Sequence, residues 1–169
     1  MSGLPTATTI AATVGILGAA WNSGGQAMLS ILAVPGLLSF STSSTTSPIS
    51  TQALAQQWAG IYNRGKVLGP QAAALSLLGY GYLAYAQHRS RGSGWQLFVG
   101  AAALTVGIVP FTLVFMDATN QVLLEVASGA ATVGSEALEG LLLRWKDLNL
   151  VRSFFPLAGA VVGLWGLLG

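Results

Sequence analysis

Polar and charged side chains gather in three short segments of an otherwise apolar sequence. Residues 62–66 include a tyrosine, an asparagine and two basic side chains, residues 117–120 an aspartate and an asparagine, and residues 144–152 an asparagine and two arginines. Such groups can do chemistry together, because a carboxylate can accept a proton while arginine and asparagine donors stabilise a developing oxyanion. A buried ion pair between these charges is the competing interpretation.

A second feature is a pair of amides inside an apolar stretch. Asn22 and Gln26 are four residues apart, so both side chains lie on one face of a helix. Polar groups at mid-membrane depth cost free energy in lipid and therefore point inward, toward a partner or a wet cavity. Hydrogen bonding between helices explains the pair equally well without a ligand.

The composition of the chain predicts a membrane protein. Of its 169 residues, 53% are hydrophobic and 7% are charged, and the mean hydropathy is +0.65. So few charges cannot cover a water-facing surface of the usual kind, whereas a lipid bilayer does not require them. Seven basic and five acidic residues leave a net charge of +2, which excludes a nucleic-acid partner because the field is too small.

The sequence is poor in metal and redox ligands. It has no cysteine and a single histidine, His88. Disulfides, thiolate metal sites, paired-histidine haem ligation and three-histidine metal sites are therefore excluded within one chain, although carboxylates could still hold a metal. We expect no metal and no organic cofactor.

Four apolar segments are long enough, at about 20 residues each, to cross a bilayer as helices. They cover residues 14–38, 67–86, 95–116 and 151–169. We therefore predict an all-α integral membrane four-helix bundle, a single domain over residues 1–169, in the endoplasmic reticulum or another endomembrane. Small residues recur in every span, which favours close helix packing within one chain or between protomers.

Two long links, residues 39–66 and 117–150, must share one side of the membrane in a four-span topology. Each contains an apolar stripe at helical spacing, which predicts one amphipathic helix in each link: Leu54, Trp58, Ile61 and Tyr62 in the first, and Leu138, Leu141, Leu142, Trp145 and Leu148 in the second. Such helices serve either as an interfacial lid or as walls of a ligand site.

Short motifs follow one another along the chain: Gln57-Trp58-x-x-x-Tyr62-x-Arg64-Gly65, Arg91-Gly92-x-x-Trp95, Pro110-Phe111-Thr112-x-x-x-Met116-x-x-Thr119-Asn120, and Leu143-Arg144-Trp145-x-x-Leu148-Asn149-x-x-Arg152. With these motifs the sequence resembles the anthrone oxygenase family of fungal aromatic polyketide pathways over nearly its whole length. The resemblance implies a monooxygenase that converts an anthrone of the emodin type to the anthraquinone, with O2 as co-substrate and without metal or flavin.

The implied chemistry assigns roles to the polar residues. An anthrone that loses a CH2 proton becomes an electron-rich anthrolate, so the protein needs an apolar slot, a base and anion-stabilising donors. Asp117 is expected to be the base, with Arg152, Asn120 and Arg64 as the other catalytic groups. Substrate binding is expected from Trp58, Tyr62, Trp145, Asn22 and Asn149.

Several alternatives stay open on the sequence alone. His88 would be the better base near neutral pH, but the four-span topology puts it on the opposite side of the membrane. Asp147 and Glu139 are further candidates if the second amphipathic helix folds into the bundle mouth. The alternative function is a non-catalytic tetraspan protein that binds or scaffolds a lipophilic intermediate. Membrane lipid is an expected partner in either case, and association into homo-oligomers is left open.

Overall fold

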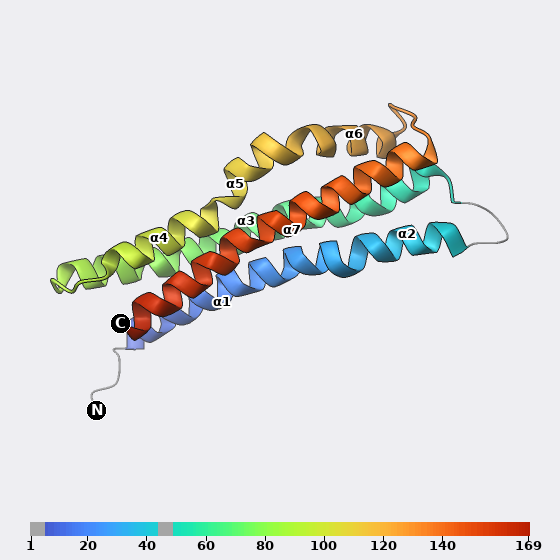
Figure 1. Cartoon of the computed structure of the whole chain (residues 1–169). Helices are drawn as coiled ribbons and strands as arrows, with labels where there is room; N and C mark the ends of the chain where they lie inside the picture. Colours follow the sequence, from blue (N-terminus) through green and yellow to red (C-terminus); the bar gives the residue numbers. More distant parts are fainter. Residues whose placement is uncertain (1–5, 44–48) are drawn as a thin grey trace. The chain divides into compact units, whose positions relative to one another are not determined.

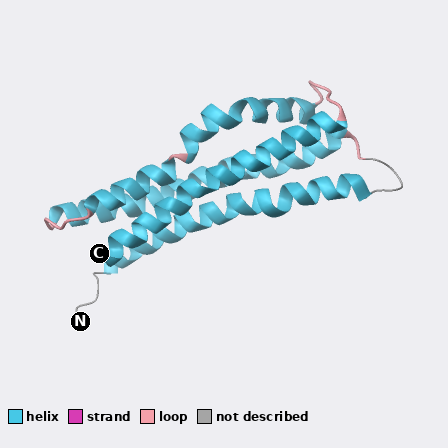
Figure 2. Cartoon of the chain, viewed as in Figure 1, coloured by secondary structure: helices cyan, strands magenta, loops and turns pink. Residues whose placement is uncertain are grey.

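The structure is a computed structural model that describes residues 6–43 and 49–169, and for residues 40–43 it describes the backbone alone. Nearly all of these residues are helical, and no strand occurs in the described ranges (Figure 2). The predicted all-α fold is therefore confirmed. Residues 44–48, which belong to the first predicted link, lie outside the described residues.

Within the described ranges the helices join into four long segments (Figure 1). The first consists of α1 (Thr6–Met28), the π-helical turn η1 (Leu29–Ala33) and α2 (Val34–Ser43). The second is α3 (Thr51–Arg89). The third consists of α4 (Trp95–Val106), α5 (Ile108–Phe111), the π-helical turn η2 (Thr112–Met116) and α6 (Asp117–Ser128). The fourth is α7 (Ser135–Leu168).

The chain forms two compact units, and each is built from part of all four segments. The first unit comprises the described residues of Met1–Gly25, Gly69–Val109 and Ser153–Gly169. The second unit comprises those of Gln26–Leu68 and Pro110–Arg152. The proposal of one domain over the whole chain stays a prediction.

The first unit is held together by glycines at helix crossings. A methyl group added at Gly79 would lie 2.6 Å from both the carbonyl oxygen of Ala11 and the backbone nitrogen of Gly15. Tyr80 is fully buried and donates a hydrogen bond of 3.2 Å to the carbonyl oxygen of Gly159. A methyl group added at Gly159 would also lie 2.8 Å from the carbonyl oxygen of Ala101. This glycine therefore allows close helix packing within one chain, as small residues do in membrane helices.

Substitution of Gly79 by alanine is expected to lower the free energy of unfolding by about 1–3 kcal/mol, the usual cost of overpacking. The clash is with backbone atoms, which cannot move aside as a flexible side chain can. Unfolding of the detergent-solubilised protein measures the effect. Gly81→Ala in the same helix is the matched control, since nothing lies within 4 Å of its added methyl group. Equal stability of the two variants would contradict the packing role.

The second unit has a core of large side chains. Its large, fully buried side chains come from all four segments: Val34, Trp58, Met116, Leu123, Val126, Leu138, Leu142 and Trp145. The polar residues singled out by the sequence near Tyr62, Asn120 and Asn149 belong to the same unit. The second unit is therefore where the candidate chemistry is found.

Two of the four segments, Trp95–Ser128 and Ser135–Leu168, are long and apolar enough to cross a membrane, judged by length and composition. Both expose large apolar side chains, such as Val114 at 72% and Trp165 at 69%. A soluble monomer rarely shows so much apolar surface, whereas lipid covers it without cost. The predicted spans 14–38 and 67–86 also lie inside helices.

The two amphipathic stripes do not form separate loop helices. The first lies in the opening turns of α3 and the second in those of α7, so each continues into the apolar part of the same helix. The helix α7 stays continuous because one buried face runs along its amphipathic and its apolar part. The buried residues of this face are Leu138, Leu142, Trp145, Asn149, Ser153, Pro156 and Ala160. The second predicted link is likewise mostly helix, and only residues 129–134 separate α6 from α7.

Candidate active site

Arg152 is the centre of a hydrogen-bond network in the second unit. Its side chain is partly buried and donates from all three nitrogens: Nε to Gln26 Oε1 at 2.9 Å, Nη1 to Thr112 Oγ1 at 2.9 Å and Nη2 to Asn149 Oδ1 at 2.6 Å. All three acceptors are neutral. Within the described part of the chain the one ion pair joins Lys146 to Asp147, so no carboxylate offsets the Arg152 charge.

Asn149 holds the network together from the interior of α7. It is fully buried, and besides accepting from Arg152 it donates from Nδ2 to the carbonyl oxygen of Gln26 at 2.7 Å and to Ser30 Oγ at 2.9 Å. Both ends of the amide are therefore engaged within the protein. Asn149 orients Arg152 and leaves little capacity for a ligand, although the sequence suggested it as a substrate-binding residue.

Both π-helical turns supply a hydroxyl to this pair. Ser30 lies in η1 and Thr112 begins η2. A π-turn rotates the residues that follow it relative to a regular α-helix, and such turns are frequent at functional sites. Near η1 the local cause is Pro35, which has no N–H to donate to the carbonyl of Ile31 four residues earlier.

An aromatic cluster forms the other half of the site. Trp58 is fully buried, stacks on Tyr62 with 5.0 Å between ring centroids, and meets Trp145 edge-on at 5.6 Å. Trp145 donates from Nε1 to Asn120 Oδ1 at 3.0 Å. The Nε1 donor of Trp58 is buried and has no acceptor among the described residues. A buried donor without a protein acceptor is available to a ligand.

Tyr62, a member of the aromatic cluster, lies within the electrostatic influence of Arg152 and Asp117. Burial raises the pKa of its phenol, the Arg152 guanidinium partly offsets this rise, and the Asp117 carboxylate adds to it. The phenol is therefore neutral at physiological pH, and its hydroxyl can donate a hydrogen bond. Its half-buried position makes Tyr62 the accessible edge of the cluster.

The structure gathers most of the predicted site residues in the second unit: Arg152, Asn149, Asn120, Trp58, Tyr62 and Trp145. Arg64 and Asp117, two predicted catalytic groups of the same unit, take no part in these hydrogen bonds and ring contacts. Arg64 is exposed, and Asp117 is exposed at the start of α6, where it accepts a hydrogen bond of 2.7 Å from Gln121 Nε2. Asn22 is buried in the first unit, with Oδ1 3.6 Å from the position of a methyl group on Gly69.

The other candidate bases lie outside the network as well. His88 belongs to the first unit and contacts the Trp95 ring edge-on. Asp147 pairs with Lys146 at 3.2 Å, and Glu139 is exposed. No three histidine or acidic side chains lie close enough to hold a metal ion together in the ranges that the structure describes.

Sequence reasoning overlooked Ser30 and gave Gln26 and Thr112 no role in the site. The spacing carried a signal for Ser30, because Asn22, Gln26 and Ser30 repeat every four residues along one helix. Thr112 stands in the motif Pro110-Phe111-Thr112, but only the three-dimensional structure shows that its hydroxyl faces Arg152.

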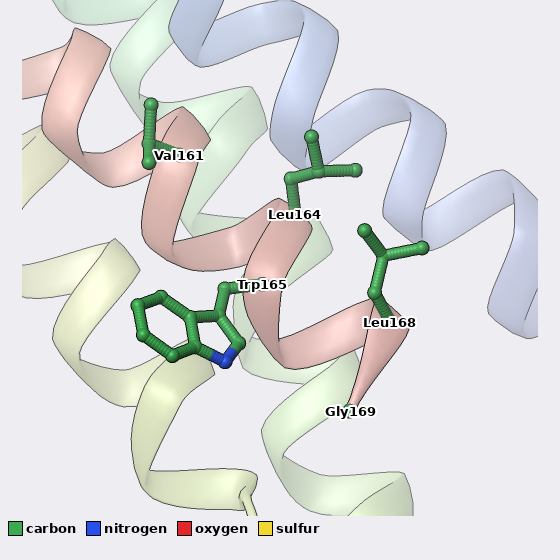
Figure 3. Close-up of a pocket in the computed structure, with 5 residues that line it drawn as sticks. All are labelled: Val161, Leu164, Trp165, Leu168 and Gly169. Atoms are coloured by element: carbon green, nitrogen blue, oxygen red, sulfur yellow. The ribbon is translucent and has the colours of Figure 1, made fainter.

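A surface hollow of about 440 Å³ lies elsewhere, in the first unit (Figure 3). Its lining is formed by the end of α7 and the residue after it: Val161, Leu164, Trp165, Leu168 and Gly169. None of these side chains could take a proton, and their one polar group is the neutral indole N–H donor of Trp165. The hollow lacks the charged donor that Arg152 supplies in the second unit.

Comparison with known proteins gives consistent matches. The family model described as anthrone oxygenase matches residues 58–162. The chain is 36% identical to anthrone oxygenase AgnL2 of Paecilomyces divaricatus over 164 residues, which cover 94% of this chain and 96% of that protein. It is 37% identical to monooxygenase hypC of Dothistroma septosporum over 145 residues, covering 84% and 74% of the two chains.

A third relative is the noranthrone monooxygenase of Aspergillus flavus, 33% identical over 160 residues, which cover 92% of this chain and 72% of that protein. No solved structure matches the chain significantly. The family model begins at Trp58 and extends past Arg152, so the aromatic cluster and Thr112, Asn149 and Arg152 fall inside the matched region, whereas Gln26 and Ser30 precede it.

Proposed function

Since the chain belongs to the anthrone oxygenase family, we propose that it oxidises an anthrone to the anthraquinone in aromatic polyketide biosynthesis, using O2 and no cofactor. The observation that carries this proposal is Arg152, a partly buried cation held by neutral acceptors beside an aromatic cluster. We further propose that the protein works in an endomembrane, where a flat, lipophilic substrate and O2 both accumulate.

The substrate itself can supply the electrons. Removal of a proton from the central CH2 of an anthrone gives an aromatic anthrolate, which passes one electron to O2 to leave an organic radical and superoxide. Recombination at the same carbon, protonation of the peroxide and loss of water give the quinone. One O2 is consumed for each anthrone, one oxygen atom enters the product, and the other leaves as water.

Arg152 would act on the first of these steps. Its positive charge stabilises the anthrolate oxygen and so makes the CH2 proton easier to remove. A guanidinium carries five N–H donors, and three bonds to protein acceptors leave two for a ligand. With no paired carboxylate, the charge is not neutralised within the described residues and remains effective toward an anion.

The aromatic cluster would hold the ring system. The Trp58 and Tyr62 rings are stacked and nearly parallel, at 14°, which is the arrangement that a flat tricycle can extend by stacking. The unsatisfied Nε1 of Trp58 can donate to an oxygen of the substrate. Both features favour a planar aromatic ligand with oxygen substituents.

Replacement of Trp58 by phenylalanine is expected to raise the dissociation constant of an anthrone about 3- to 10-fold, the usual worth of one hydrogen bond. The fold loses no hydrogen bond, because Nε1 has no acceptor among the described residues. Equilibrium binding under anaerobic conditions measures the change without turnover. Trp165→Phe, at an indole that is 69% exposed in the first unit, is the control. Unchanged affinity in Trp58→Phe would rule out the donor role.

Asp117 is kept as the proposed base, because its charge reaches Tyr62 although it is exposed. Replacement by asparagine preserves the shape and removes the proton acceptor, so kcat is expected to fall roughly 10²–10⁴-fold. Single-turnover oxidation measures the step. Glu125→Gln, at an exposed carboxylate of the same helix, controls for lost charge. Normal turnover by Asp117→Asn would eliminate Asp117 as the base.

The proposed function is tested by O2 uptake with emodin anthrone and purified, metal-stripped protein in detergent. We expect one O2 consumed for each anthraquinone formed, at a rate well above the protein-free oxidation of the anthrone. Binding of the anthrone without any rate above that background would overturn the oxygenase and favour the alternative, a protein that carries or scaffolds the intermediate.

A further inference from the structure

The charges of the first unit are confined to one short segment. This unit contains no aspartate or glutamate in its sequence, and its basic side chains are Arg89 and Arg91, next to His88. The rest of its surface exposes large apolar side chains, including Leu17 at 61% and Leu78 at 70%. A bundle of this kind suits a lipid environment, with one positively charged segment, residues 88–91, at the end of α3.

The backbone of this segment is unusual. Arg91 has φ of 56°, the one positive φ of a non-glycine residue in the described part of the chain. Its N–H donates to the carbonyl of His88 at 3.1 Å, and the N–H of Gly92 donates to that of Gln87 at 3.0 Å. This pattern ends α3 in a Schellman motif, where the left-handed position normally holds glycine. An arginine there costs stability, and glycine directly follows it in the sequence.

Aromatic side chains flank the two arginines. Arg89 Nη1 donates to the hydroxyl of Tyr85 at 3.1 Å, and Trp95 lies 5.1 Å from the His88 ring. Tyrosine and tryptophan are enriched where a membrane protein meets the headgroup layer, and arginines at that depth attract anionic lipids. A basic side chain at a helix C-terminus also offsets the helix dipole, which accounts for Arg89 but not for the strained position of Arg91.

We infer that residues 88–91 bind the headgroup of an anionic phospholipid, with Arg89 and Arg91 as the cationic contacts and Tyr85 and Trp95 at the lipid boundary. The strained backbone at Arg91 is then explained by the charge that its side chain presents. This site lies in the first unit and is independent of the proposed oxidation.

The test places the full-length protein in nanodiscs of phosphatidylcholine alone or with added phosphatidylserine, and measures the unfolding midpoint and the lipid retained in native mass spectrometry. We expect a higher midpoint and preferential retention of phosphatidylserine for the wild type. The Arg89→Gln/Arg91→Gln variant is expected to lose the difference between the two lipids, since each arginine contributes about fivefold in affinity near a charged membrane surface.

Two further variants make the result decisive. Arg91→Gly relieves the backbone, so its midpoint in phosphatidylcholine is expected to rise above the wild type while its response to phosphatidylserine shrinks. Arg144→Gln/Lys146→Gln in the second unit should keep the full response. Inorganic phosphate added to phosphatidylcholine discs should have no effect, which separates a headgroup site from a free-phosphate site. An undiminished phosphatidylserine response in the double arginine variant, or an equal loss of stability in both lipids, would overturn the inference.

Discussion

Replacement of Arg152 by glutamine is expected to lower kcat for anthrone oxidation by roughly 10²–10³-fold, the range found when one oxyanion donor is removed. Glutamine can still accept and donate hydrogen bonds, but it carries no charge to stabilise the anthrolate. The three acceptors around Arg152 are neutral, so the rest of the network is not left with an unpaired carboxylate. The measurement is O2 uptake at saturating anthrone, with quinone formation followed by absorbance.

Two companion variants separate charge from shape. Arg144→Gln removes an exposed arginine of the same helix and should leave kcat unchanged. Arg152→Lys keeps the charge but loses the planar fork that three acceptors hold, so its kcat should fall between those of the wild type and Arg152→Gln. Full activity of Arg152→Gln, in protein that unfolds at the normal temperature, would remove Arg152 from the mechanism.

Sequence patterns predicted the helices and the clustering of polar site residues near their ends, because both features are visible in short stretches of sequence. Apolar runs of helical length are visible in any sequence, and so is the clustering of Tyr62, Asn120 and Arg152 near the ends of those runs. Sequence reasoning did not predict that the amphipathic stripes continue into the membrane spans as the single helices α3 and α7. This continuity depends on the buried stripe of the amphipathic part staying in phase with that of the apolar part, for instance from Trp145 through Asn149 to Ser153.

The roles of individual residues depended on contacts that no spacing reveals. Ser30 was missed because a serine in an apolar helix is common, and its position facing Asn149 arises in a π-helical turn. Asp117 looked central because it adjoins a predicted span, yet α6 begins at this residue and leaves the carboxylate exposed beside Gln121. Whether it takes the proton therefore stays a prediction.

A second large effect is expected from Asn149→Asp, which changes the charge of the site with little change in shape. Asn149 Oδ1 lies 2.6 Å from Arg152 Nη2, so the new carboxylate would pair directly with the guanidinium and neutralise it. If the oxidation requires an uncompensated positive charge, kcat should fall nearly as far as in Arg152→Gln. The side chain also stops donating to the Gln26 carbonyl, a loss expected to cost about 1–3 kcal/mol of unfolding free energy.

Asn149→Ala distinguishes this charge effect from a loss of positioning. Alanine removes every side-chain hydrogen bond of Asn149, including the one that orients Arg152, but it adds no negative charge. Charge control of the reaction therefore predicts lower activity in Asn149→Asp than in Asn149→Ala, although aspartate preserves more of the network. The opposite order would show that the alignment of Arg152 matters and its free charge does not, and it would turn the search for the anion-stabilising group toward the Trp58 donor.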